Sequence, residues 1–215
     1  HPGGPGQALR GHPAGPGGHW WADSVRRLME RLGQVRTRSG ERLIFTTEAF
    51  TEPGIGAFDS YLPHLHHPRP EEPCVYDAVY HEYTSFHGCY TGGGYQPDGT
   101  LSRAAATCLA LGRPLGWFYH GFHNDQYLTP AAAAEMAFVR ELALARQGLG
   151  RFLATGRMLR PPVVRLQGTD AGGEAPVLAS VWEEGDEAQV VAVNYSDAPV
   201  RIRLELGGVT GALGR

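Results

Sequence analysis

The sequence contains no lysine, so all 19 of its basic residues are arginine. They are matched against 22 acidic residues, which gives a formal net charge of −3 at pH 7. Such a balance leaves no broad basic surface for phosphate backbones. We therefore expect no nucleic-acid partner.

Cysteine is also scarce. Cys74, Cys89 and Cys108 stand far apart and form no CxxC pair, which argues against a structural zinc site and against a dense disulfide framework. One bridge between Cys74 and Cys89 stays open as an alternative, although reduced thiols are the simpler interpretation.

Long apolar runs and common cofactor motifs are missing as well. No run approaches the roughly 20 apolar residues that cross a bilayer, so we expect no membrane insertion. None of the patterns GxGxxG, GxxxxGK[ST], HExxH or GxSxG occurs, which argues against dinucleotide, P-loop, zincin and serine-hydrolase functions. We expect no cofactor.

The first 160 residues alternate short apolar runs with helical patterns. After a loop of glycine, proline and histidine over 1–19, apolar residues at three- and four-residue spacing predict a helix over 20–35. The remaining predicted elements are strands over 43–47, 55–62, 75–83 and 114–119 and helices over 101–111 and 130–147. Buried strands that alternate with helices indicate an α/β fold with parallel pairing.

Beyond Pro161 and Pro162 the pattern changes to antiparallel β-structure. Strands are predicted over 177–182, 189–194 and 200–206, the first two joined by a turn at Gly185. We therefore divide the chain into a first domain over 1–160 and the start of a small all-β domain, a β-sandwich, over 161–215. The start at His1 and the glycine-rich end lead us to expect a fragment, truncated at both ends.

Acidic, histidine and aromatic residues gather at the predicted strand ends. In a parallel α/β barrel the carboxyl ends of all strands meet on one face, so these residues would share one pocket. We expect Glu48 to be partly desolvated there, with a raised pKa that suits a general acid. Asp59 is the second catalytic candidate, because a buried aspartate needs partners or a function. The predicted substrate-binding residues are Trp20, Glu52, Tyr80, His81, Glu82 and His120.

The histidines do not form a recognisable metal site. His64, His66 and His67 lie between two prolines in a predicted loop, and their spacing matches no common zinc arrangement. His120 and His123 lack the helical context of a paired zinc site and are predicted only to line the pocket. Adjacent residues point to opposite faces of a strand, so only one of His81 and Glu82 would face the pocket.

Four motifs occur in a characteristic order: GHPAGPGGHWW over 11–21, TTEAFTEP over 46–53, AFDSYL over 57–62 and VYHEY over 79–83. Together they resemble the second half of a glycoside-hydrolase-like TIM barrel, in an uncharacterised bacterial family distantly related to the α-galactosidase-type clan. The resemblance implies that the four strands are the fifth to eighth of a (β/α)8 barrel, followed by a β-sandwich. It also implies a catalytic nucleophile on the fourth strand, upstream of His1, and an acid/base near the end of the sixth.

On that mapping Asp59 is the acid/base by position and Glu48 by environment. The function we expect is a carbohydrate-active hydrolase, of which this chain holds one carboxylate of the pair. Two alternatives stay open. One is a non-catalytic carbohydrate-binding protein on a degenerate barrel, and the other is a structural surface protein. Half a barrel has two unpaired edges, so we expect the chain alone to be poorly stable or to dimerise.

Overall fold

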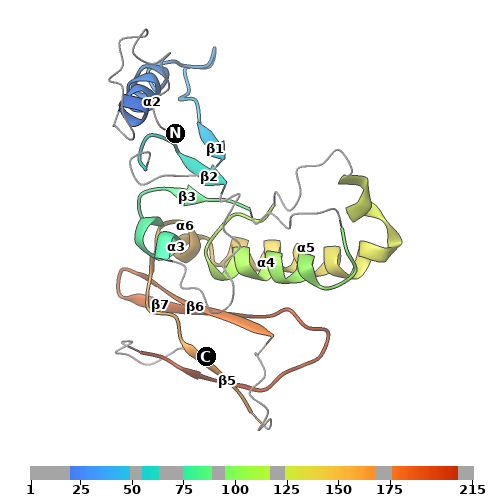
Figure 1. Ribbon diagram of the computed structural model, residues 1–215. Coiled ribbons are helices and arrows are strands. Elements are labelled where there is room, and N and C mark those ends of the chain that lie inside the picture. Colours follow the sequence, from blue (N-terminus) through green and yellow to red (C-terminus); the bar gives the residue numbers. More distant parts are fainter. Residues whose placement is uncertain are drawn as a thin grey trace.

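The computed structural model describes residues 20–48, 55–62, 75–88, 95–116, 124–167 and 176–207. These residues form a mixed structure of helices and strands. The first helix and a small parallel sheet lie at one end, antiparallel strands lie at the other, and the remaining helices lie between them (Figure 1). No closed barrel is present in the described ranges.

The parallel sheet follows the first helix. Helix α2 spans Trp20–Leu32, which confirms the predicted helix in shortened form, but it buries Met29 and leaves Leu28 of the predicted apolar stripe exposed. Strands β1 (Thr46–Glu48), β2 (Ser60–Leu62) and β3 (Ser85–Phe86) pair in parallel in the order β1-β2-β3. The first two predicted strands are thus confirmed in shortened form.

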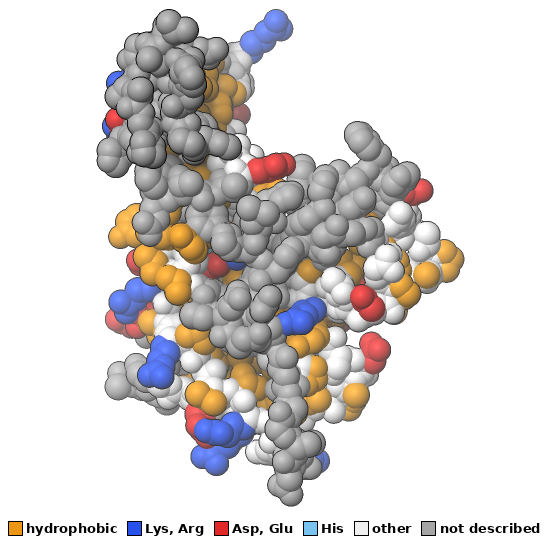
Figure 2. All heavy atoms as spheres, in the orientation of Figure 1, with side chains coloured by type: hydrophobic (Ala, Val, Ile, Leu, Met, Phe, Trp, Pro, Cys, Tyr) orange, Lys and Arg blue, Asp and Glu red, His pale blue; other side chains and the backbone are white. Residues whose placement is uncertain are grey.

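The strand predicted over 75–83 is wrong, because this segment forms helix α3, Val75–Tyr80. Its β-branched and aromatic residues favour a strand by propensity. Burial follows the helical period instead, since Asp77, His81 and Thr84 are buried four and three residues apart. Burial of Asp77 against Arg113 outweighs the local preference. The apolar side chains that α3 leaves exposed, Val75, Tyr76 and Val79 with Tyr83 just beyond, gather at the left of Figure 2.

The helical layer contains α4 (Thr100–Ala110), α5 (Ala133–Gly148) and α6 (Gly150–Thr155), with 3-10 turns η2 (Asn124–Leu128) and η3 (Pro130–Ala132) before α5. The two predicted helices are confirmed, with the first turn of the second tightened into η3. Alanines on α4 are buried and let α5 pack closely against it. The strand predicted over 114–119 is absent in its described part, 114–116, and its remainder lies outside the described residues.

Five strands lie in the described part of the chain after α6: β4 (Arg157–Met158), β5 (Val163–Leu166), β6 (Val177–Glu184), β7 (Glu187–Asn194) and β8 (Ile202–Glu205). They form two antiparallel sheets, β4-β6-β7 and β5-β8. The predicted turn is confirmed, with Gly185 at φ 61° between β6 and β7. The third predicted strand pairs with β5, a strand that the sequence pattern did not reveal.

One apolar core joins the helical layer to the antiparallel sheet. It runs from Ala105 on α4 through Leu153 on α6 to Trp182 on β6 and Val193 on β7. Trp182 is fully buried, and its indole N–H donates to the Ser180 hydroxyl over 2.9 Å. This core contains residues from both sides of position 160. The domain boundary predicted at that position stays a prediction. Among the described helices, none combines the length and the apolarity that a bilayer crossing needs.

Candidate functional site: the carboxyl edge of the parallel sheet

The parallel pairing places Glu48, Leu62 and His87 in one row at the carboxyl edge of the sheet. Glu48 pairs with Leu62, and the His87 N–H, directly after β3, donates to the Tyr61 carbonyl over 2.9 Å. Neighbouring strands lie about 4.8 Å apart, so the Cα atoms of Glu48 and His87 are separated by about 10 Å. Residues in register share a face, and Glu48 and His87 therefore project from the same side of the sheet.

His87 is a site residue that the sequence reasoning missed, together with Ser60. The Ser60 hydroxyl lies 2.6 Å from Nδ1 of His87 and 2.9 Å from the Ser85 carbonyl. Burial lowers the pKa of His87, so its imidazole is neutral near pH 7. The sequence signal for His87 is the SFH triplet over 85–87, which contains strand β3. The sequence analysis overlooks this triplet because it places the strand over 75–83, the segment that forms α3.

Glu48 keeps its predicted position at the end of β1, but its side chain is exposed. The expected desolvation of Glu48 is therefore wrong for the free protein.

Asp59 lies at the opposite, amino edge of the sheet, which corrects the expectation that it lies near the carboxyl end of a strand. It precedes β2, accepts a hydrogen bond of 2.8 Å from the Phe45 amide before β1, and forms an ion pair with Arg42. The hydrogen bond from Arg42 holds the pKa of Asp59 below its usual value, and the Phe45 amide adds to this while burial opposes it. This ionised carboxylate ties the start of β1 to β2 and is a poor proton donor.

The remaining predicted residues do not gather at the carboxyl edge. Tyr80 and His81 lie on and just after α3, where Tyr80 stacks on Tyr76 with ring centroids 5.9 Å apart. His81 is buried with its ring 4.7 Å from that of Trp182. Glu82 follows it and is exposed. The α3 helix thus changes the placement that a strand would have given these side chains.

Three other predicted residues cannot be placed by their side chains. Trp20 begins α2, and its side chain lies outside what the structure describes, as do Glu52 and His120 altogether. Across the described ranges, no group of three histidine, cysteine, aspartate or glutamate side chains is arranged to hold a metal ion.

A buried ion pair anchors α3 below the sheet. Nε and Nη2 of Arg113, just after α4, donate to the two carboxylate oxygens of Asp77 over 2.6 and 2.7 Å. Both side chains are almost fully buried, at 3% and 4% exposed. This bidentate contact fixes the position of α3 relative to α4, and so of β3 and His87 that follow α3.

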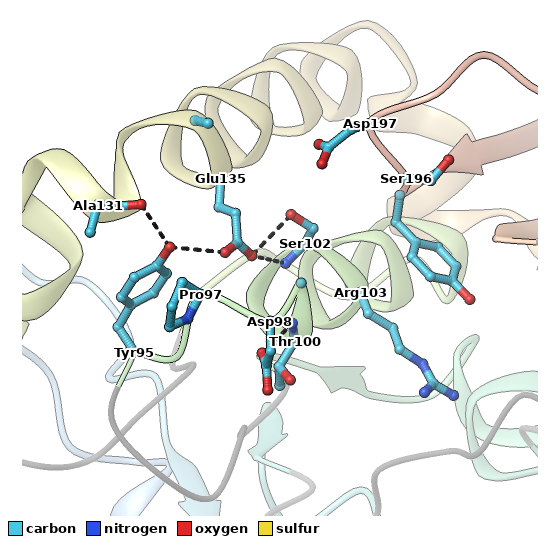
Figure 3. A pocket seen from close by; sticks show the side chains of 13 residues that line it. Tyr95, Pro97, Asp98, Thr100, Ser102, Arg103, Ala131, Glu135, Ser196 and Asp197 are labelled. Carbon is cyan, nitrogen blue, oxygen red and sulfur yellow. Dashed lines mark hydrogen bonds between the residues drawn. The ribbon is translucent and has the colours of Figure 1, made fainter.

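A separate cavity of about 760 Å³ opens between α4, η3 with the start of α5, and the turn after β7. Glu135 on α5 forms part of its wall and accepts hydrogen bonds from the amide and hydroxyl of Ser102 over 3.0 and 3.1 Å. The Tyr95 hydroxyl lies 3.0 Å from the other Glu135 oxygen and 2.8 Å from the Ala131 carbonyl (Figure 3). The cavity therefore has a rigid wall that the sequence analysis did not anticipate.

Comparison with known proteins gives a partial match. A family model described as "Domain of unknown function (DUF6259)" matches residues 7–91, a region that contains α2, α3 and all three strands of the parallel sheet. The comparison with curated proteins finds no match. The comparison with solved structures finds none either.

Proposed function

We propose that this chain forms part of a carbohydrate-active hydrolase that cleaves glycosidic bonds at the carboxyl edge of the β1-β2-β3 sheet. The observation that carries the proposal is the row formed by Glu48 and His87 on one face of that edge. In parallel α/β folds the carboxyl edge is where substrates bind. The three strands are then part of a TIM barrel, and the two antiparallel sheets belong to the following β-sandwich.

Glu48 is the proposed acid/base. Within the described residues it is the sole carboxylate that ends a strand of this sheet. It protonates the leaving glycosidic oxygen as the bond to the sugar carbon breaks, and that carbon is taken up by a nucleophile on the opposite face, either water or a second carboxylate. The neutral His87, held by Ser60, orients a substrate hydroxyl. Hydrolysis also requires a second carboxylate, within about 10 Å of the first.

The proposal is tested by hydrolysis of a panel of aryl α- and β-glycosides, measured on the protein at its full natural length. General acid/base catalysis contributes about 10²–10⁴-fold, so Glu48→Gln is expected to lower turnover by that factor. Asp59→Asn is the matched control, since it removes a charge from the other edge of the same sheet.

Circular dichroism must show that both variants are folded. Retained turnover in Glu48→Gln would remove this residue from the mechanism. Absence of turnover on every glycoside would overturn the hydrolase proposal in favour of a carbohydrate-binding protein.

A further inference from the structure

The cavity between α4, α5 and the turn after β7 lies outside the proposed catalytic edge. Its volume of about 760 Å³ is within the range of small-molecule sites, about 300–1,000 Å³. Two distant parts of the chain build it, residues 95–103 with 131–135 on one side and 195–197 on the other. Pockets at such junctions are common ligand sites.

The cavity wall is held in place before any ligand arrives. One carboxylate oxygen of Glu135 accepts hydrogen bonds from Ser102 and the other accepts one from the Tyr95 hydroxyl. These contacts hold the first turn of α4 against α5. Asp98 is fixed as well, because one of its oxygens accepts the Thr100 amide over 2.9 Å. A fixed wall lowers the conformational entropy that binding costs.

Other polar groups remain available to a ligand. Arg103 and Asp197 both line the cavity, and neither forms an ion pair with another residue in the described part of the chain. Asp98 also lines the cavity, although Thr100 already contacts its carboxylate. Figure 3 shows Asp98 and Thr100 on one side of the contact between Ser102 and Glu135, and Asp197 on the other.

The mixture of charges selects the class of ligand. Asp98, Glu135 and Asp197 outnumber Arg103, which disfavours phosphates and other anions. A purely cationic ligand would leave the donors of the Arg103 guanidinium in the same cavity unused. A neutral molecule with many hydroxyl groups satisfies both, because each hydroxyl donates to a carboxylate and accepts from the guanidinium.

The apolar part of the lining narrows the choice further. Pro97, Ala131 and Ala134 line the cavity beside two tyrosines, Tyr95 and Tyr195. The C–H faces of a pyranose ring fit such surfaces, while its hydroxyls reach the polar rim. We infer that this cavity is a binding site for a neutral sugar unit, separate from the catalytic edge and not itself hydrolytic.

The test is isothermal titration calorimetry of the 215-residue chain with methyl α- and β-glycosides of glucose, galactose and mannose. We expect at least one of them to bind, with the affinity lowered about tenfold or more in Arg103→Gln and in Asp197→Asn, since each removes a charged hydrogen-bond partner. Arg140→Gln, an exposed arginine of α5 that does not line the cavity, is the matched control and should bind like the wild type.

Several results would overturn the inference. These are no sugar binding at millimolar concentration, binding that both cavity variants leave unchanged, and preferential binding of inorganic phosphate or spermidine in the same assay. Glu48→Gln separates this site from the proposed function, because it should lower hydrolysis by about 10²–10⁴-fold and leave this binding intact. A protein that binds sugar here but hydrolyses no glycoside would refute the hydrolase proposal alone.

Discussion

Loss of the Asp77 carboxylate is expected to destabilise the fold severely. In Asp77→Asn the Arg113 guanidinium stays buried, at 3% exposure, and loses the opposite charge and one of the two acceptors that now contact it at 2.6 and 2.7 Å. Removing one partner of a buried ion pair costs about 3–5 kcal/mol, which is a large part of the roughly 5–15 kcal/mol that stabilises a typical domain. The midpoint of urea unfolding, followed by circular dichroism, should fall sharply or the variant should fail to fold.

Two further variants sharpen this measurement. Glu205→Gln removes the acidic partner of Arg165 in an exposed ion pair and is expected to leave the midpoint unchanged. The double replacement Asp77→Leu with Arg113→Met is expected to recover most of the lost stability, because it removes the buried arginine charge together with its acidic partner. A free-energy loss below about 1 kcal/mol in Asp77→Asn would refute the reasoning, since the charge would then be solvated by some other route.

Further predictions concern the junction between α3 and β6. Gly112→Ala should cost about 2–5 kcal/mol of unfolding free energy: its backbone is left-handed, and a Cβ would lie 2.7 Å from Trp182 and 2.9 Å from His81. Gly185 shares the left-handed backbone, but a Cβ there would meet nothing within 4 Å, so Gly185→Ala should cost about 1–2 kcal/mol. If urea unfolding gave the same loss of free energy for both variants, the predicted clash of a Cβ at Gly112 with Trp182 and His81 would be contradicted. Burial lowers the pKa of His81, helped by Arg146 and opposed by Asp77, and burial also lowers that of His87. The unfolded chain therefore takes up protons first, so stability should be complete above about pH 6.5 and decline as the pH falls below it. His81→Gln should flatten this dependence in urea midpoints measured from pH 5 to 8, and an unchanged slope would argue against the role of His81.

The sequence predicts elements well where one periodicity acts alone. Helix α5 and the hairpin of β6 and β7 follow directly from helical spacing and from a glycine turn between alternating strands. The prediction fails over 75–83, where strand propensity and helical burial compete and the deciding contact is made by Arg113, 36 residues away from Asp77. No local pattern reports such a partner.

The candidate site is predictable only in part for the same reason. Glu48 can be placed because it follows its strand directly. The sequence pattern assigns Asp59 to the wrong edge because β2 begins after it, a boundary that the apolar run does not mark. Ser60 and His87 come together only through the pairing of β2 with β3, since 27 residues separate them in sequence.

The core that connects α4, α6 and the β4-β6-β7 sheet affects how the chain can be divided experimentally. Trp182 and Val193 are covered by side chains such as Ala105 and Leu153, which precede residue 160. A shorter polypeptide limited to 161–215 would expose these apolar surfaces to water and should aggregate or remain unfolded. We therefore expect the strands of the β4-β6-β7 sheet to unfold together with the helices in one cooperative transition, rather than to serve as an independently transferable module.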